Sequence, residues 1–176
     1  MCRFTSCNYQ LITTWCFRSP LQPVFDTLFD SLRWPEWWPG VEMAEELFAG
    51  NADGTESIRR YHWKSLLPYR LSFDATAARI EPPFLLEGTV NGDLRGRARC
   101  LLAHSDGITS VRFEWYVRTT KAWMNLLAPM AHMLFAYNHR MLMERGARAL
   151  AGRLGVELLA VEYNEQPLEQ RRPVDD

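Results

Sequence analysis

Apolar and polar residues alternate most regularly between residues 108 and 119. The apolar ones share one face of an extended chain: Val111, Phe113, Trp115 and Val117. The other face is polar: Arg112, Glu114, Tyr116 and Arg118. A period of two is typical of an antiparallel strand that is buried on one side. We therefore expect Arg112, Glu114 and Arg118 to face solvent.

Residues 94–104 repeat this alternation, but their apolar face is unusually small. Gly96 and Ala98 stand where a densely packed interior would carry Leu, Ile or Phe. Two explanations are open at this point. Large side chains of an opposing element fill the space, or a cavity is kept there for a ligand.

Turn signals divide the middle of the chain into further strands. Asn-Gly at 91–92 and Asp-Gly at 106–107 tolerate the backbone angles of tight turns. Aromatic residues share strand faces in two neighbouring segments: Tyr61 with Trp63, and Tyr69 with Leu71 and Phe73. Such side chains can line an apolar cavity and still offer a hydroxyl or an indole N–H to a polar atom.

A helical spacing of apolar residues follows the last strand, from about residue 121 to 154. Residues three and four apart form one stripe: Trp123, Leu127, Met130, Leu134, Asn138 and Met141. A shorter helical pattern occupies residues 19–32. The predicted order is one strand, short helices, six antiparallel strands and a long C-terminal helix, which is an α+β fold.

Length and composition indicate one globular domain. Of the 176 residues, 47% are hydrophobic, and the formal net charge is -1. This balance gives no electrostatic drive toward nucleic acid or an anionic membrane surface, so we predict neither partner. We place the domain at residues 1–155 and expect residues 156–176 to be a partly disordered tail.

The N-terminal residues lack a signal-peptide pattern, and the cysteines form no C-x-x-C pair. Reduced thiols and a cytoplasmic location are the expectation. Residues 122–138 lack charged side chains, but Asn125, His132 and Asn138 would be costly in lipid. We therefore predict a core helix there and no membrane insertion.

The four histidines form no catalytic or metal-binding signature. His132 and His139 lie seven residues apart on the predicted helix, about 10.5 Å along its axis, too far to share one metal without other ligands. His62 and His104 fall on strands, and no histidine is spaced from a carboxylate or a cysteine as in a triad or a zinc set. We predict no metal and no cofactor, and we assign no catalytic residue.

The stretch RWPEWWPG at residues 33–40 concentrates Trp34, Trp37 and Trp38 between two prolines. Tryptophans in such a segment can fill a core, form the rim of a pocket or offer a surface to a partner.

Five segments together resemble the SRPBCC or START-like (Bet v 1-like) superfamily, and within it the polyketide cyclase/dehydrase-like proteins of bacteria. They are SPLQPVFDTLFD, WPEWWPGV, GDLRGRARCLL, VRFEWYVRTTKAWMNLLAP and FAYNHRMLMERG. The resemblance covers about residues 10–154. It implies a helix-grip fold, in which a curved antiparallel sheet of about seven strands wraps around the C-terminal helix and two short helices follow the first strand. It also implies an apolar cavity between sheet and helix, which favours the cavity explanation for Gly96 and Ala98 and places Trp38 at the cavity rim.

The residues predicted to bind a ligand in that cavity come from both sheet and helix: Trp38, Arg59, Tyr61, Trp63, Tyr69, Phe73, Trp115, Met130, Leu134 and Asn138. Arg59 could hold a carboxylate or an enolate, or reach to the edge of the cavity. Asn138 could anchor a ligand or bind a strand backbone.

Two functions remain after these observations. The first is binding of a hydrophobic small molecule such as a lipid, an isoprenoid or a polyketide-like ring system. The alternative is a cyclase or dehydratase that folds a poly-β-keto chain, gaining rate mainly from proximity. A third and weaker hypothesis is a protein-interaction module that uses exposed tryptophans. The ligand and the oligomeric state are left open by the sequence.

Overall fold

The computed structural model describes residues 8–64, 69–120 and 128–166. The strands are β1 (Asn8–Arg18), β2 (Val41–Phe48), β3 (Ile58–Lys64), β4 (Arg70–Glu81), β5 (Leu85–Gly92), β6 (Leu94–Ser105), β7 (Ile108–Thr119) and β8 (Glu157–Gln166). The helical segments are α1 (Leu21–Phe29), η1 (Ser31–Arg33), α2 (Trp34–Trp37) and α4 (Ala128–Leu154). The predicted order of strand, short helices, six strands and long helix is confirmed. The start of the helix predicted at 121–127 lies outside the described residues.

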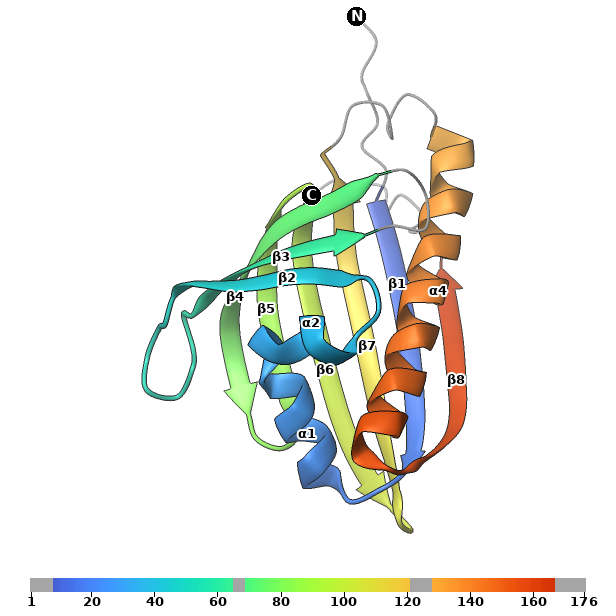
Figure 1. Ribbon diagram of the computed structural model, residues 1–176. Coiled ribbons are helices and arrows are strands. Elements are labelled where there is room, and N and C mark those ends of the chain that lie inside the picture. The colour runs from blue at the N-terminus through green and yellow to red at the C-terminus, as the bar shows by residue number, and fades with distance from the viewer. Residues whose placement is uncertain (1–7, 65–68, 121–127, 167–176) are drawn as a thin grey trace, which may run out of the picture.

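The strands form one antiparallel sheet in the order β2-β3-β4-β5-β6-β7-β1-β8. The sheet curves, and α1, α2 and α4 all lie against its inner face (Figure 1). The six strands β2 to β7 form a meander because each is joined to the next by a short connection and pairs with it. The predicted helix-grip architecture is therefore confirmed, with eight strands in place of about seven.

The additional strand, β8, corrects the predicted C-terminal boundary. Residues 157–166, expected in a tail, pair antiparallel with β1. The pattern was obscured by a bulge at Cys16/Phe17, which sets Leu158 opposite Phe17 and Val161 opposite Trp15. Because Leu158 and Val161 are three residues apart, their shared face breaks the period of two. The ordered domain therefore reaches residue 166, and residues 167–176 lie outside the described residues.

A fully buried part of the core lies where α4 packs on β1. Trp15, Phe17 and Tyr9 of β1 are fully buried, as are Ala147 and Leu150 of α4. Burying a large apolar side chain stabilises a fold by about 1.5–3 kcal/mol. The buried stripe of α4 matches the predicted one at Asn138 but has Phe135 and Leu142 in place of Leu134 and Met141, and it continues through Met143, Ala147 and Leu150.

Trp38 joins this core at the point where α2 meets α4. The side chain is 2% exposed, and its indole Nε1 donates a hydrogen bond to the carbonyl of Leu142 at 3.0 Å. A Cβ on Gly146 would lie 2.4 Å from the same indole ring, so only glycine allows helix and ring to approach this closely. Of the roles open to Trp38, the structure gives it core packing. Trp37 is 9% exposed and therefore also buried, whereas Trp34 is half-buried.

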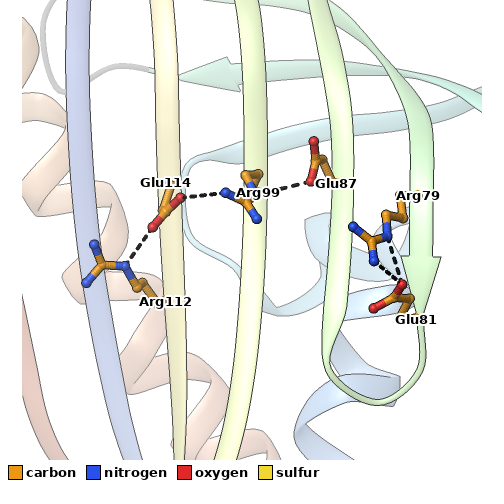
Figure 2. A network of polar contacts seen from close by, with 6 residues as sticks. All are labelled: Arg79, Glu81, Glu87, Arg99, Arg112 and Glu114. Atoms are coloured by element: carbon orange, nitrogen blue, oxygen red, sulfur yellow. Dashed lines mark hydrogen bonds and ion pairs between the residues drawn. The ribbon is translucent and has the colours of Figure 1, made fainter.

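The outer face of the sheet carries a row of ion pairs across β5, β6 and β7 (Figure 2). Arg99 approaches Glu87 at 3.1 Å and Glu114 at 3.5 Å, and Arg112 Nε donates to Glu114 at 2.7 Å. Arg112 and Arg118 are exposed as predicted. Glu114 lies on the predicted face but is only 8% exposed, which corrects the expectation that it faces solvent. Arg99 and Arg112 pair with its carboxylate, and the buried Ile12 is its register partner on β1.

Candidate ligand-binding site

A cavity of about 170 Å³, here called the main cavity, lies over the inner face of β4, β5 and β6. A row of small residues crosses these strands, because Ala77 pairs with Gly88 and Gly88 pairs with Ala98. A Cβ on Gly88 would lie 2.5 Å from the backbone oxygen of Thr76, so even alanine does not fit there without a shift. No large side chain rises from the row, and the space above it stays open.

Aromatic rings contribute to the other walls of the main cavity. The rings come from α2, β3, β4 and β7: Trp34, Tyr61, Trp63, Phe73, Phe113 and Trp115. Leu28 and Phe29 of α1 add further apolar surface. Glu87 and Arg99 also border the cavity, but their side chains pair with each other on the outer face (Figure 2). The cavity is therefore suited to an apolar molecule.

Three hydrogen-bonded side chains form the polar corner of the main cavity: Ser31, Arg59 and Tyr61. Arg59 Nη1 donates to Ser31 Oγ at 2.8 Å and to the carbonyl of Phe29 at 3.2 Å. Ser31 Oγ and Tyr61 Oη share a hydrogen bond of 2.6 Å. Burial raises the pKa of Tyr61 despite the hydrogen bond shared with Ser31 and the charge of Arg59, so the phenol keeps its proton. Glu46 lies 3.7 Å from Arg59 Nη2.

Of the two small residues singled out on β6, only Ala98 borders the main cavity. Gly96 is required for a different reason. Its φ is +155°, and a Cβ there would lie 2.0 Å from the carbonyl oxygen of Tyr116 on β7. Close approach of two strands explains Gly96, whereas room for a ligand explains Ala98.

A second space of about 30 Å³, here called the minor cavity, lies between the sheet and α4. Its lining comprises Leu11, Trp63, Leu71, Leu94, Trp115, Val117, Phe135, Asn138, His139 and Leu142. His139 Nε2 shares a hydrogen bond of 3.2 Å with Thr13 Oγ1. Burial, with a smaller effect from the charge of Arg140, lowers the pKa of His139 to about 4. The imidazole is therefore neutral near pH 7.

Neither a protein-family model nor a curated protein sequence matches this chain. Solved structures do match. The ZhuI aromatase/cyclase from Streptomyces sp. R1128 superposes with a TM-score of 0.67 at 13% identity, covering 84% of this chain and 94% of that one. This chain has the START-like helix-grip fold.

Two further structures share the START-like fold. A START superfamily protein from Mycobacterium smegmatis gives a TM-score of 0.65 at 17% identity, covering 84% of this chain and 97% of that one. The di-domain ARO/CYC StfQ from the steffimycin biosynthetic pathway gives a TM-score of 0.63 at 10% identity, covering 85% of this chain and 52% of that one.

In the described part of this chain, no helix combines the length and the apolar character that a membrane span requires.

Within this START-like fold, five of the ten residues predicted to bind ligand line the main cavity: Arg59, Tyr61, Trp63, Phe73 and Trp115. Asn138 lines the minor cavity, as do Trp63 and Trp115.

The other predicted residues lie elsewhere. Trp38 and Tyr69 line neither of the two cavities. Leu134 is 39% exposed on the outer side of α4, because its neighbour Phe135 is the residue that packs into the core. Met130 is at the start of α4, where side chains lie outside the description.

Many lining residues of the main cavity were not predicted, and three of them shape the site most directly: Phe113, Trp34 and Ser31. Phe113 could have been found, since it lies on the predicted inner face of β7 together with Trp115. Trp34 was part of the tryptophan cluster, and its Nε1 donates to the carbonyl of Leu28 at 3.1 Å, which fixes the ring beside α1. Ser31 carries no sequence signal, because a lone serine in a short helical turn is common.

The main and minor cavities contain few side chains suited to acid–base catalysis. Cys100 borders the main cavity, but burial raises the pKa of its thiol, which keeps the sulfur protonated. Among the described residues, no three His, Cys, Asp or Glu side chains group as metal ligands. What the main cavity offers chemically is an apolar enclosure with Tyr61 and Arg59 as hydrogen-bond donors.

Proposed function

We propose that this chain binds a small apolar molecule in the main cavity. The observation that carries the proposal is the open space over Ala77, Gly88 and Ala98, faced by aromatic rings. Because a cavity of about 150 Å³ with apolar walls can hold benzene, a volume of about 170 Å³ suits a body of one or two rings. Shape and burial supply the affinity, and the Ser31–Arg59–Tyr61 corner orients a polar atom of the ligand.

Filling the cavity tests this function. Ala98→Phe places a ring over the row of small residues formed by Ala77, Gly88 and Ala98. It is expected to abolish the uptake of naphthalene, which calorimetry measures. The free energy of unfolding should change by less than about 1 kcal/mol. Ala103→Phe is the matched control, because Ala103 is exposed on the same strand. Unchanged uptake in folded Ala98→Phe would contradict the proposal. Native mass spectrometry of freshly purified protein would identify a molecule that co-purifies.

A cyclase or dehydratase activity is the second candidate, and the polar corner favours it. Tyr61 remains protonated, so its hydroxyl could donate to a carbonyl of a bound poly-β-keto chain while Arg59 stabilises the enolate. Two of the structural neighbours described above carry aromatase/cyclase names. Tyr61→Phe separates the candidates, because it should retain binding of naphthalene and abolish turnover of a poly-β-keto substrate. Cytoplasmic location stays a prediction.

A further inference from the structure

Two side chains, Trp63 of β3 and Trp115 of β7, line both the main and the minor cavity. Their ring centroids are 6.1 Å apart, and the ring planes are inclined by 68°. The two spaces are therefore neighbours with an indole pair between them. Displacement of one indole would connect the two spaces into one channel.

Of the two indoles, Trp63 is the one whose displacement toward a hydrogen-bond acceptor would lower the free energy. The side chain is 6% exposed, and its Nε1–H has no hydrogen-bond acceptor among the described residues. Its neighbours are rings that offer no good acceptor, namely Trp38 at 5.6 Å and Phe73 at 5.9 Å. A buried donor without an acceptor costs free energy, and that cost is relieved when an oxygen is supplied. An oxygen on a ligand would thus offset the cost of rotating the ring.

The minor cavity has the chemistry of a small, uncharged polar pocket. No Lys, Arg, Asp or Glu is among its lining residues, whereas Asn138 and neutral His139 are. A charged group would lose its hydration there without an ion partner. The volume of about 30 Å³ exceeds the ~10–15 Å³ that one water requires, so the pocket has room for a group the size of a hydroxyl or a carbonyl.

We propose that the minor cavity is a second subsite for the same ligand. The apolar body occupies the main cavity, and a short arm ending in an uncharged oxygen passes Trp63 and Trp115 into the minor cavity. The ligand is then an apolar ring system with a hydroxyl- or carbonyl-terminated arm of two or three atoms. This inference rests on the proposed function, because the body must bind first.

Three probes test it by calorimetry on the whole chain: naphthalene, propylnaphthalene and hydroxyethylnaphthalene. Val117→Ile adds one methyl group to the lining of the minor cavity only, and Val90→Ile adds one to the main cavity only. Both valines are buried, at 4% and 3% exposed, so the variants are closely matched. Wild type should bind hydroxyethylnaphthalene most tightly. Val117→Ile should weaken that probe about tenfold and naphthalene less than about twofold, whereas Val90→Ile should weaken all three alike.

Trp63→Phe supplies the second measurement, because it keeps a ring and removes the N–H. The preference for hydroxyethylnaphthalene over propylnaphthalene should fall about fivefold. Equal effects of Val117→Ile on all probes, or no advantage of the hydroxyethyl arm in wild type, would overturn the second subsite while leaving the proposed function intact. Failure of wild type to bind naphthalene would overturn the proposed function itself. Melting temperatures of each variant establish that the binding results come from folded protein.

Discussion

Small residues face aromatic rings both on α4 at Gly146 and on the sheet at Gly88 and Ala98, with opposite results. At Gly146 on α4 the space is filled, since the indole of Trp38 lies where a Cβ would be. Over Gly88 and Ala98 the space remains as the main cavity. The difference is the anchoring of the ring. Trp38 is held against α4 by its hydrogen bond to the Leu142 carbonyl, whereas Trp34, a ring of the main cavity, is held beside α1 by its hydrogen bond to the Leu28 carbonyl. A small residue thus indicates room, and its partner decides whether the room is used for packing or for a ligand.

Trp38→Ala removes the indole that fills the space beside Gly146, and it should have the largest effect on the free energy of unfolding. Loss of a buried tryptophan costs about 3–5 kcal/mol of unfolding free energy. Because Trp38 lines neither cavity, the naphthalene bound per folded molecule should stay unchanged. Chemical denaturation and calorimetry measure the two quantities. A small stability change with lost binding would mean that Trp38 belongs to the ligand site.

Gly146→Ala overfills the same place. The added methyl group meets a rigid indole, so we expect a loss of about 1–3 kcal/mol, although alanine favours helix by about 1 kcal/mol. Gly152→Ala is the matched control on α4, because nothing lies within 4 Å of its Cβ position. That variant should gain stability. Equal thermal shifts for the two variants would show that Trp38 does not need Gly146.

His139 gives the minor cavity a pH dependence. Its pKa is lowered to about 4 in the folded chain, so the unfolded chain binds more protons between about pH 6.5 and pH 4. Stability from the neutral imidazole is therefore present above about pH 6.5 and lost as the pH falls through that window. We expect a loss of about 1–2 kcal/mol, below the full value because the ring is partly exposed. Denaturation curves should show this loss in wild type and a smaller one in His139→Gln.

Glu114→Gln tests whether the ion pairs on the outer face of the sheet affect the cavity on its inner face. The pairs Gly88–Ala98 and Glu87–Arg99 are neighbouring rows of the same two strands, so ion pairs lie beside the bare inner row. Removing one charge should cost about 1 kcal/mol, less in high salt, with naphthalene binding unchanged. Urea denaturation at two salt concentrations measures it. Altered naphthalene binding would show that the ion pairs on the outer face influence the shape of the main cavity.

Much of the candidate site could be predicted from strand alternation. Arg59, Tyr61 and Trp63 alternate on β3, and all three line the main cavity. Prediction was poorest on α4, where Leu134 was chosen and Phe135 is the buried residue. A strand has only two faces, so a clear alternation assigns each residue to one of them, whereas helix residues are spread about every 100° around the axis and a broad apolar stripe leaves its buried centre undetermined.

The sequence by itself determined the order of the elements and the inner and outer faces of the central strands, because hydrophobic periodicity is local and each element expresses it independently. Only the tertiary structure decided what depends on contacts between distant segments. Pairing with β1 turned residues 157–166 into a strand. Gly96 and Ala98 are small residues on one face of β6, but for different reasons. The close approach of β7 requires glycine at 96, whereas the main cavity lies above Ala98. A small side chain specifies only how much volume it leaves, and the side chains packed across from it determine whether that volume is filled.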